Sequence, residues 1–578
     1  MRRIISLVSC LSLVACQTLP ATNTTTRKFE AAPAKSWSSG GMVASANPLA
    51  TKAGVEILEK GGSAVDAAIA VQTVLTLIEP QSSGIGGGAF MLYYDAKTGD
   101  VQSYDGREAA PMGATPDMFM DKATGKPMEF WTAVKSGRST GAPAVLKMLH
   151  LAWSDHGKLG WDQGFQNAKT LATNGYQLTP RTAELLQVLP KMTEPGEGVK
   201  KYFYGPDGKP YAAGTLMKNP AFAKTMDDIA TQGIDVFYKG YIAQDIVKAV
   251  QSKPIPGTLS MEDMANVRVE RKEPLCQTYR VHLICGMGMP SSGGIGELMI
   301  MGIVENFDMP KMGNGIEGIH HYIEAQRLGY IDRDTYVADD KFVAVPVKGL
   351  LDKKYLKSRA DLLSDSSSFD TVSPGTPEGA QKRGKDATGK EHGTSHFVIV
   401  DKEGNVVSMT TSVENLFGAQ TMVDGFFINN QLTDFSMLPV DSDGVPIVNA
   451  VAPGKKPRSS MSPTIVFDKD GQFELGIGSP GGNAIIAYVT KALIGILDWN
   501  MPLQDALDQP NIIARSTPVS MEFSRMDKAK LDGLTALGHK FTGGGGAENS
   551  GLHAIMFKDG KLIGAADSRR EGNAVAVH

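Results

Sequence analysis

The pattern of apolar positions predicts two consecutive helices near the start of the main body of the chain. In residues 47–80, Asn47 can cap a first helix, the Gly-Gly pair at 61–62 can end it, and Ser63 can cap a second that runs to Ile78. Both segments are apolar nearly all round. We therefore expect both helices to be buried.

Short alternating stretches joined by polar, glycine-containing turns recur through the rest of the chain. Such turns typically join antiparallel strands. They lie at residues 95–99, 401–405, 468–471 and 558–560. Helical patterns cover residues 142–156, 218–253 and 315–330. The pattern predicts an α+β fold with helices layered on antiparallel sheets.

Residues 361–393 differ in character from the segments on either side. They are poor in apolar residues and rich in Gly, Ser, Pro and Lys, and at Thr394 an apolar strand begins abruptly. Such a composition is typical of a flexible segment. We expect a mobile tail that ends at Gly393.

The composition places the chain among globular proteins and argues against one class of partner. Of the 578 residues, 42% are hydrophobic, which is ample for a large core. The formal net charge is -4, and Lys and Arg are scattered along the chain. Because binding to a phosphate backbone needs a basic surface, nucleic acid is not an expected partner.

The N-terminus has the pattern of an export signal. Two arginines precede an apolar stretch that ends at Ala15 and is too short to span a bilayer, and Cys16 follows. We expect residues 1–15 to be a signal peptide and residues 16–40 a polar tether. On this interpretation the protein is periplasmic and anchored to a membrane through a lipidated Cys16; an ordinary cleaved signal with a chance cysteine is the alternative.

Two cysteines in the body of the chain flank a predicted tight hairpin. Cys276 and Cys285 lie on either side of the alternating residues 279–282. In an oxidising compartment the pair could close a disulfide. Two buried thiols remain the alternative, because a one-residue error in register would separate the sulfur atoms beyond bonding distance.

Thr394 is a candidate nucleophile. A threonine hydroxyl reacts only when a base takes its proton, and an N-terminal threonine carries such a base in its own α-amino group, with a reference pKa of about 7.7 to 8.0. A cut after Gly393 would create that amino group. Glycine tolerates the strained backbone that such a self-cleavage requires.

Six sequence motifs, one of which contains Thr394, resemble those of a known enzyme family. They are GTSHFVIVDKEGNVVSMTTSVENLFG from Gly393, NNQLTDFS from Asn429, PRSSMSPTIV from Pro457, GSPGG from Gly478, SYDGREAAP from Ser103 and PSSGG from Pro290. In sequence and order they resemble the gamma-glutamyltransferase family, and the similarity runs from Gly41 to the C-terminus. The resemblance implies an N-terminal-nucleophile fold, a four-layer αββα sandwich cut from one precursor into a large subunit (41–393) and a small subunit (394–578).

The resemblance also implies the catalytic residues. Thr394 matches the nucleophile, and Ser412 stands where the family usually has a second threonine whose hydroxyl bonds that nucleophile. Gly481 and Gly482 match the backbone amides of the oxyanion hole, where a side chain would prevent close approach. No cofactor is implied.

The substrate-binding residues fall into two groups in the same resemblance. Arg107 matches the anchor for the substrate's α-carboxylate, and Ser459 and Ser460 add hydroxyl donors. The groups that match the α-amino side are Glu414, Gln431 and Asp434. Glu414 occupies a position that is asparagine in many family members, and a carboxylate there can also accept from an ammonium.

Three weaker patterns carry no site. Residues 84–88 are glycine-rich but follow a helix and precede a strand, the reverse of a dinucleotide-binding loop. The spacing of His320, His321 and Glu324 could place two ligands on one helical face, but no third ligand is evident, so we expect no metal. Residues 437–452 lie where some family members carry a lid and contain no tyrosine, which leaves a working lid in doubt.

The expected function is transfer of a γ-glutamyl group from glutathione or related amides, through an ester on Thr394, to water, an amino acid or a peptide. The first alternative is a glutaryl β-lactam acylase, whose substrate lacks the α-amino group. Asp434 argues against it, because an unpaired buried carboxylate costs several kcal/mol. A non-catalytic, lipid-anchored protein that binds γ-glutamyl compounds is the second alternative.

Overall fold

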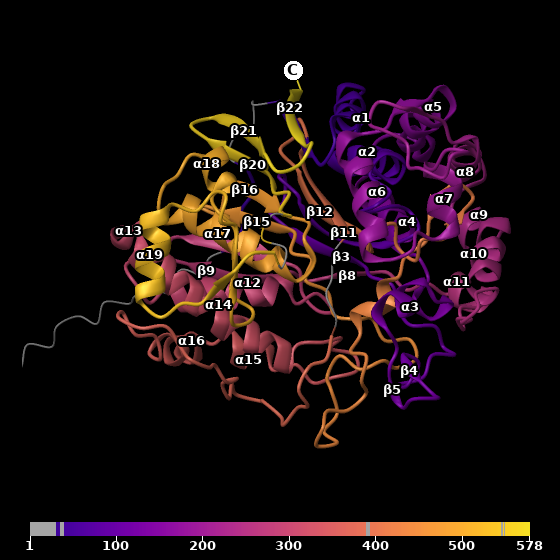
Figure 1. Ribbon diagram of the computed structural model, residues 1–578. Helices are drawn as coiled ribbons and strands as arrows, with labels where there is room; N and C mark the ends of the chain where they lie inside the picture. The colour runs from indigo at the N-terminus through magenta and orange to yellow at the C-terminus, as the bar shows by residue number, and fades with distance from the viewer. Residues whose placement is uncertain (1–29, 35–39, 389–392, 545–546, 548, 578) are drawn as a thin grey trace, which may run out of the picture.

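Two antiparallel β-sheets packed face to face form the centre of the protein, and helices cover both outer faces (Figure 1). The computed structural model describes residues 30–34, 40–388, 393–544, 547 and 549–577. The predicted signal peptide, Cys16 and the residues just before Gly393 lie outside this part. Within it, the predicted four-layer αββα sandwich is confirmed.

The first sheet has seven strands, and the first strand of its central hairpin contains the candidate nucleophile. Every neighbouring pair is antiparallel. The order is β22 (Asn573–Val577), β1 (Gly41–Ser45), β11 (Gly393–Val400), β12 (Val406–Glu414), β2 (Gly88–Tyr94), β3 (Val101–Gly106) and β8 (Glu270–Lys272).

The second sheet has six strands and packs against the first through apolar side chains. Val398 and Val406 of the first sheet share one cluster with Ile465 and Ile555 of the second. The order is β21 (Lys561–Ala566), β20 (His553–Lys558), β16 (Phe473–Gly478), β15 (Thr464–Phe467), β10 (His282–Gly286) and β9 (Leu275–Tyr279).

A helical layer and a lobe that extends it cover the first sheet. The predicted caps are present, since Asn47 accepts from the backbone of the first helix and Ser63 forms a capping box with Asp66. The helices are α1 (Pro48–Glu59), α2 (Ala64–Ile78), α3 (Phe130–Lys135), α4 (Val145–His156), α5 (Gln166–Asn174), α6 (Pro180–Met192), α7 (Glu197–Phe203), α8 (Pro220–Gln232), α9 (Asp235–Tyr238), α10 (Tyr241–Gln251) and α11 (Met261–Ala265). All of α2 is buried, but the expected burial of α1 was wrong on one side, where Lys52 and Glu59 face solvent.

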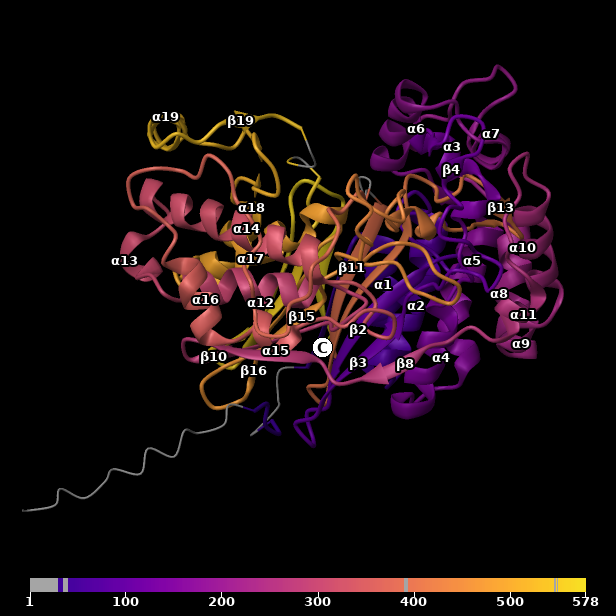
Figure 2. The ribbon, with the colours of Figure 1, turned by 90° about the horizontal axis from the view of Figure 1, so that it is seen from below.

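The helices on the other outer face pack around α12 and α17. Figure 2 shows the sheets between this layer and the helices α1, α2 and α4. The helices are α12 (Gly293–Val304), α13 (Met309–Met312), α14 (Ile316–Tyr336), α15 (Val347–Leu350), α16 (Lys353–Ala360), α17 (Ile485–Leu497), α18 (Leu503–Asp508) and α19 (Lys528–Ala536). A small sheet of β17 (Ile512–Ile513), β18 (Val519–Met521) and β19 (Phe541–Thr542) lies beside α14.

The four predicted glycine turns all join antiparallel neighbours, namely β2 to β3, β11 to β12, β15 to β16 and β20 to β21.

The parts of the chain before and after Gly393 both contribute strands to each of the two large sheets. β11 and β12 lie between β1 and β2, and β15 pairs with β10. A cut at this glycine would therefore leave two fragments that share both sheets.

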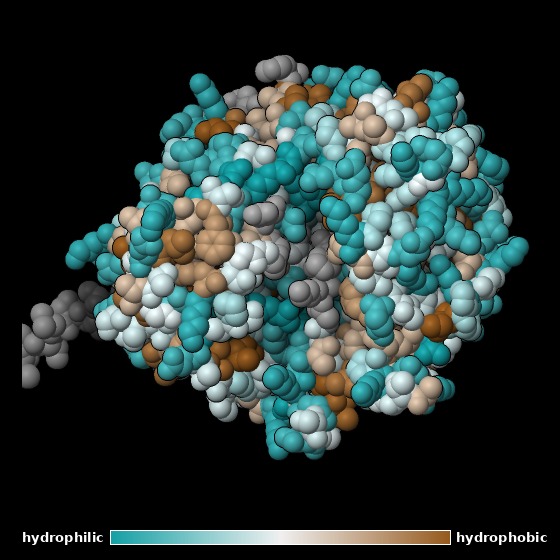
Figure 3. Space-filling model, in the orientation of Figure 1, coloured by the Kyte–Doolittle hydropathy of each residue, from teal (hydrophilic) through white to brown (hydrophobic). Residues whose placement is uncertain are grey.

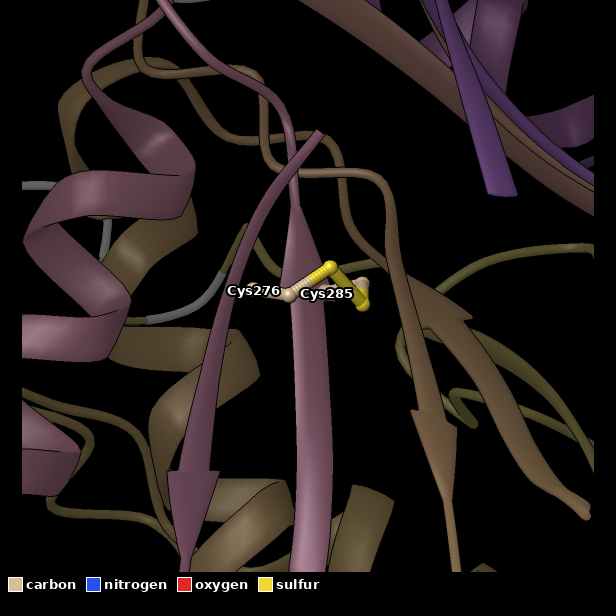
Figure 4. The surroundings of a disulfide bond; sticks show 2 residues. All are labelled: Cys276 and Cys285. Atoms are coloured by element: carbon tan, nitrogen blue, oxygen red, sulfur yellow. A yellow bond between two sulfur atoms is a disulfide. The ribbon is translucent and has the colours of Figure 1, made fainter. Parts of the chain in front are cut away.

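The two body cysteines form a disulfide at the edge of the second sheet (Figure 4). Cys276 on β9 lies directly opposite Cys285 on β10. Their Cα atoms are 4.1 Å apart. The tight hairpin was predicted, and of the two alternatives for its cysteines the structure has the disulfide.

The surface is mixed in character. On the face in Figure 3, hydrophobic residues are scattered among hydrophilic ones and form no single large patch. Among the described helices, none has the length and apolar composition that crossing a membrane requires.

Candidate active site

Thr394 lies at the start of the central strand β11, where the strand pairing is irregular. Gly393 pairs with Glu414 and Ser395 with Thr411, so β12 has one extra residue opposite Thr394. Glu414 has a φ of 80°. A positive φ is uncommon in a residue with a side chain, and such strained backbone clusters at functional sites.

The hydroxyl of Thr394 contacts the peptide bond that it is predicted to attack. Its Oγ1 donates to the carbonyl oxygen of Gly393. The hydroxyl of Ser412 donates to the same oxygen over 2.6 Å and accepts from the N–H of Glu414 over 2.8 Å. The resemblance implies a bond from Ser412 to the nucleophile itself, whereas in the uncut chain Ser412 donates to the carbonyl of Gly393. This geometry places a nucleophile and a donor on one carbonyl group.

Arg570 lies beside the nucleophile, although no sequence motif predicts it there. Its Nη1 donates to the carbonyl oxygen of Thr394 over 3.2 Å, and its Nη2 donates to the carbonyl of Asn549 over 2.7 Å. On the next residue, the hydroxyl of Ser395 donates to Glu79 over 2.9 Å, and burial raises the pKa of that carboxyl group. No local pattern could identify Arg570, because its contact joins residues 176 positions apart.

Three predicted substrate-binding residues come together in one buried cluster. Arg107 forms an ion pair with Asp434, and Gln431 Nε2 donates to the same carboxylate oxygen over 3.1 Å. Arg107 also donates to the carbonyls of Pro457 and Arg458, over 3.1 Å and 3.0 Å. Within the described part of the chain, Arg107 Nη1 and Gln431 Oε1 have no hydrogen-bond partner. Both atoms therefore remain available to a ligand.

Glu414 is fixed to the same turn as Gln431 and Asp434. This turn is the 3₁₀ helix η3 (Gln431–Asp434). The carboxylate of Glu414 accepts from the amide of Asn430 and from the hydroxyl of Thr433, the latter over 3.4 Å. The three residues predicted for the amino-group side therefore share one rigid support.

Ser459 and Ser460 lie in a network between helix α14 and the GSPGG turn. The hydroxyl of Ser459 accepts from the N–H of Met461 over 3.1 Å. The hydroxyl of Ser460 accepts from Arg333 and donates to Asn483 over 3.2 Å. Their predicted contribution to binding the α-carboxylate stays a prediction.

The backbone of the GSPGG turn requires glycine. Gly481 has a φ of 133° and Gly482 a φ of 57°. A Cβ atom on Gly481 would lie 2.3 Å from a ring carbon of Tyr488. A side chain at this position would clash with the ring. The predicted role of these two amides as an oxyanion hole stays a prediction.

The predicted tail is bonded to the rim of the substrate cluster in the uncut chain. Arg458 donates to Asp386 over 2.7 Å. Asn449 donates both to the hydroxyl of Thr388, over 2.9 Å, and to the carbonyl of Asp434, over 2.6 Å. The tail is therefore one side chain away from the cluster. Its mobility after a cut stays a prediction.

Residues 437–452, where a lid was in doubt, are held from two sides. The N–H of Gly384 donates to the carbonyl of Pro446 over 3.0 Å. Lys455 donates to the carbonyls of Val448 and Ala450, over 2.6 Å and 2.8 Å, and burial lowers its pKa to about 8. In the uncut chain this segment and the tail hold each other in place.

Burial controls the charge of several groups close to the nucleophile strand. His396, on β11, shares a hydrogen bond of 2.8 Å with the hydroxyl of Thr410. Burial lowers the pKa of His396 well below the usual value. Burial lowers the pKa of His553, on β20, to about 3. Next to Arg107, burial raises the pKa of Glu108 to about 8. Both histidines are therefore neutral at pH 7, and burial favours the protonated form of Glu108.

A family model described as gamma-glutamyltranspeptidase matches residues 50–577. The chain belongs to the gamma-glutamyltranspeptidase family. It is 36% identical over 549 residues to the glutathione hydrolase proenzyme of Bacillus subtilis (strain 168), covering 93% of this chain and 92% of that protein. It is 35% identical over 543 residues to the proenzyme of the same name from Escherichia coli (strain K12), covering 92% and 90%.

The fold also matches a relative with a different name. The crystal structure of cephalosporin acylase from Bacillus halodurans superposes with a TM-score of 0.81 at 26% identity, covering 94% of this chain and 97% of that one. The gamma-glutamyltranspeptidase family is a family of N-terminal-nucleophile hydrolases, and the predicted fold and enzyme class are confirmed. Because the family contains proteins named for different substrates, the substrate has to be argued from the pocket.

Proposed function

We propose that this member of the gamma-glutamyltranspeptidase family is a glutathione hydrolase and γ-glutamyltransferase that activates itself by cutting between Gly393 and Thr394. The contact of the Thr394 hydroxyl with the Gly393 carbonyl, to which Ser412 also donates, is the observation that carries the proposal.

The cut proceeds by attack of the Thr394 oxygen on the carbonyl carbon of Gly393. The C–N bond breaks, the nitrogen takes a proton, and an ester joins Gly393 to the threonine oxygen. Water then hydrolyses this ester to give a carboxylate on Gly393 and a free α-amino group on Thr394. Ser412 stabilises the charge that develops on the carbonyl oxygen.

Turnover repeats the chemistry on an external amide. The α-amino group of Thr394 takes the proton of its own hydroxyl, whose oxygen attacks the γ-carbonyl of the substrate. The amine leaves with a proton, and a γ-glutamyl ester remains on the threonine. Water completes hydrolysis, whereas the amino group of an amino acid or peptide completes transfer. The amides of Gly481 and Gly482 are proposed to stabilise the oxyanion in both steps.

Recognition requires the substrate to enter between two charges that face each other in the uncut chain. Arg107 would bind the α-carboxylate, assisted by Ser459 and Ser460. The α-ammonium would bind Asp434 together with Glu414 and Gln431. The substrate therefore replaces one buried ion pair with two, and a planar guanidinium can bind a carboxylate through two parallel bonds.

The ion pair changes the case against a glutaryl acylase. We expected Asp434 to be an unpaired carboxylate in a glutaryl pocket, but Arg107 neutralises it without any ligand. Asp434 would therefore lose its partner only when Arg107 turns to the carboxylate of a bound substrate. The specific support for a glutamyl substrate is that Glu414, at the end of β12, is hydrogen-bonded to the turn that carries Gln431 and Asp434. Together these residues supply more acceptors than a plain glutaryl chain can use.

Product analysis with glutathione tests the proposed substrate. Purified protein should release glutamate from glutathione, and an added dipeptide should divert the γ-glutamyl group into a new peptide. Release of glutarate from a glutaryl amide, with glutathione left intact, would establish the acylase. A protein that stays a single band on a denaturing gel and releases neither product would establish the non-catalytic binding protein.

The proposed location rests on the N-terminal sequence pattern. We propose export to the periplasm and a lipid anchor on Cys16. Replacing Cys16 with serine should move the protein from the membrane fraction to the soluble fraction, with activity retained. Mass spectrometry that finds an unmodified mature N-terminus would contradict the anchor.

A further inference from the structure

The helix α14 carries a polar cluster that the proposed reaction does not use. His320 and Glu324 lie on this helix, and His539 reaches them from the loop after α19, which packs beside α14 (Figures 1 and 2). One nitrogen or oxygen from each residue lies within 4.8 Å of the other two. Their exposed fractions are 0%, 1% and 3%, so the cluster is out of solvent. The sequence pattern on α14 offers no third ligand, and the fold supplies His539.

His321, which the sequence analysis considered together with His320, belongs to a different network. Its Nδ1 contacts the carbonyl of Glu317 over 2.9 Å, and its Nε2 contacts the carboxylate of Asp365 over 3.1 Å. The side chain of Asp365 is 83% exposed. His321 is therefore a neighbour of the cluster but not a member of it.

The contacts that link Ser364, His320, His539 and Glu324 are one proton short. The carbonyl of Ser364 lies 2.7 Å from His320 Nε2, and His320 Nδ1 lies 2.7 Å from His539 Nε2. His539 Nδ1 in turn lies 3.5 Å from Glu324 Oε1. Two neutral imidazoles supply two protons for these three gaps, so in one of them two lone pairs face each other. A further proton or a metal ion in that gap would replace the repulsion between the lone pairs with attraction.

The geometry of the third gap favours a metal ion over a proton. His539 Nδ1 is buried and has no hydrogen-bond partner among the described residues, because 3.5 Å is too long for such a bond. Two ligands on a tetrahedral zinc ion, each bonded at roughly 2.0–2.1 Å, are about 3.4 Å apart. To bring the ligand atoms of the cluster from within 4.8 Å of one another to this spacing, the side chains must move on the order of 1 Å.

The surroundings of the cluster also suit a metal ion. The carbonyl of Ser364, which faces one ring nitrogen of His320, would orient that ligand from outside the cluster. The N–H of Phe369 donates to Glu324 over 3.1 Å and would orient the carboxylate.

A cavity of about 20 Å³ borders His539. This volume suffices for one water molecule on the His539 side of the cluster, since neither His320 nor Glu324 lines the cavity. Exposed residues, among them Thr517 and Lys540, line the same cavity, so it lies close to the surface.

Arg327 is the one cation already beside this carboxylate in the described structure. Its Nη1 lies 3.3 Å from Glu324 Oε1, a long contact, and donates to the carbonyl of Phe369 over 2.6 Å. The guanidinium can therefore keep its shorter bond when Glu324 turns to an ion.

We propose that His320, Glu324 and His539 bind one divalent transition-metal ion, zinc by the chemistry of the ligands. The first two residues precede Gly393 and the third follows it. The ion therefore joins the two subunits that the proposed cut produces. Binding itself does not depend on that cut; only the joining of separate chains does.

Metal analysis of the purified full-length protein tests the site. Protein purified in the presence of zinc and then freed of unbound ions should contain one zinc ion per chain. His539→Gln should lower the content by roughly 10-fold or more, since even loss of an outer partner of a ligand costs 10- to 100-fold in affinity. His321→Gln is the matched control, because it removes a neighbouring buried imidazole from the same helix and should keep the zinc.

A second measurement needs no variant and covers the case in which His539→Gln fails to fold. Wild-type protein stripped with a chelator should bind one cobalt(II) ion per chain with the visible absorption of a four-coordinate site, and zinc should displace it. The melting temperature should fall on stripping and return with zinc. Absence of zinc from the wild type together with no cobalt spectrum would overturn the proposal and leave a proton as the missing cation. Equal zinc in the wild type and in folded His539→Gln would also overturn it.

Discussion

Replacing Asp434 with asparagine separates recognition of the substrate's amino group from recognition of its carboxylate. In the uncut chain Asp434 is buried and pairs with Arg107 and Gln431. Losing one partner of a desolvated charge pair costs about 2 to 5 kcal/mol, or roughly 30-fold to 5,000-fold in kcat/KM. Asp434→Asn should therefore lower kcat/KM for a γ-glutamyl anilide by at least about 30-fold.

The same substitution should act differently on a glutaryl anilide, which has the carboxylate but no ammonium. The variant no longer holds Arg107 in an ion pair, so the guanidinium is free for the carboxylate of the substrate. Activity on the glutaryl anilide should stay level or rise. Arg107→Lys is the crossed control, because both substrates carry the carboxylate and both should lose activity. Equal losses on both anilides with Asp434→Asn would refute the assignment of Asp434 to the ammonium.

Three further predictions concern the cut, the effect of pH and the disulfide. Ser412→Ala should slow self-cleavage about 100- to 1,000-fold while Ser412→Thr restores it, as followed on denaturing gels; an unchanged rate in the alanine variant would remove this hydroxyl from the mechanism. Burial lowers the pKa values of His396 and His553, so just below about pH 6.5 the unfolded chain binds protons at these residues and the folded chain does not. The free energy of unfolding should therefore fall by about 1.4 kcal/mol per pH unit for each histidine as the pH drops. Equal stability in urea at pH 7 and pH 5 would contradict this. Reducing the Cys276–Cys285 bond should cost about 3 kcal/mol and lower the melting temperature, whereas an unchanged value would show that it constrains nothing.

Much of the fold could be predicted because its determinants are local. The caps at Asn47 and Ser63 and the four glycine turns are short patterns, and each is found where the sequence predicts it. The segment 218–253 was expected as a helical region, and the structure divides it into three helices at Gly233 and Gly240. Short breaks of this kind depend on packing as much as on local preference.

Other elements could not be predicted because their pattern is ambiguous. Helix α17 consists of two short apolar runs on either side of Thr490 and Lys491, and a short apolar run can be a buried strand or a buried helix. Helix α12 begins with two glycines and is buried all round, so it has no amphipathic pattern to detect. In both cases the two-sided packing that determines the helix is a property of the whole fold.

In the candidate site, motifs predict single residues, whereas the contacts between them arise only in the folded chain. Arg107 and Asp434 were predicted separately from motifs, but their ion pair joins positions 327 residues apart and no motif describes it. Arg570 and His539 were missed for the same reason, since each meets its partners only through the tertiary fold. Sequence motifs therefore identified the groups, whereas the structure determined which groups face each other before any substrate is present.

Sequencing the N-terminus of the smaller fragment of the purified protein tests the central claim most directly. The account predicts two fragments, one ending at Gly393 and one starting at Thr394, with Thr394→Ala left as a single uncut chain. The wild-type fragment should begin with Thr394 in every preparation that hydrolyses a γ-glutamyl anilide. An active enzyme that remains uncut, or a fragment that begins at any other residue, would contradict the assignment of Thr394 as the nucleophile.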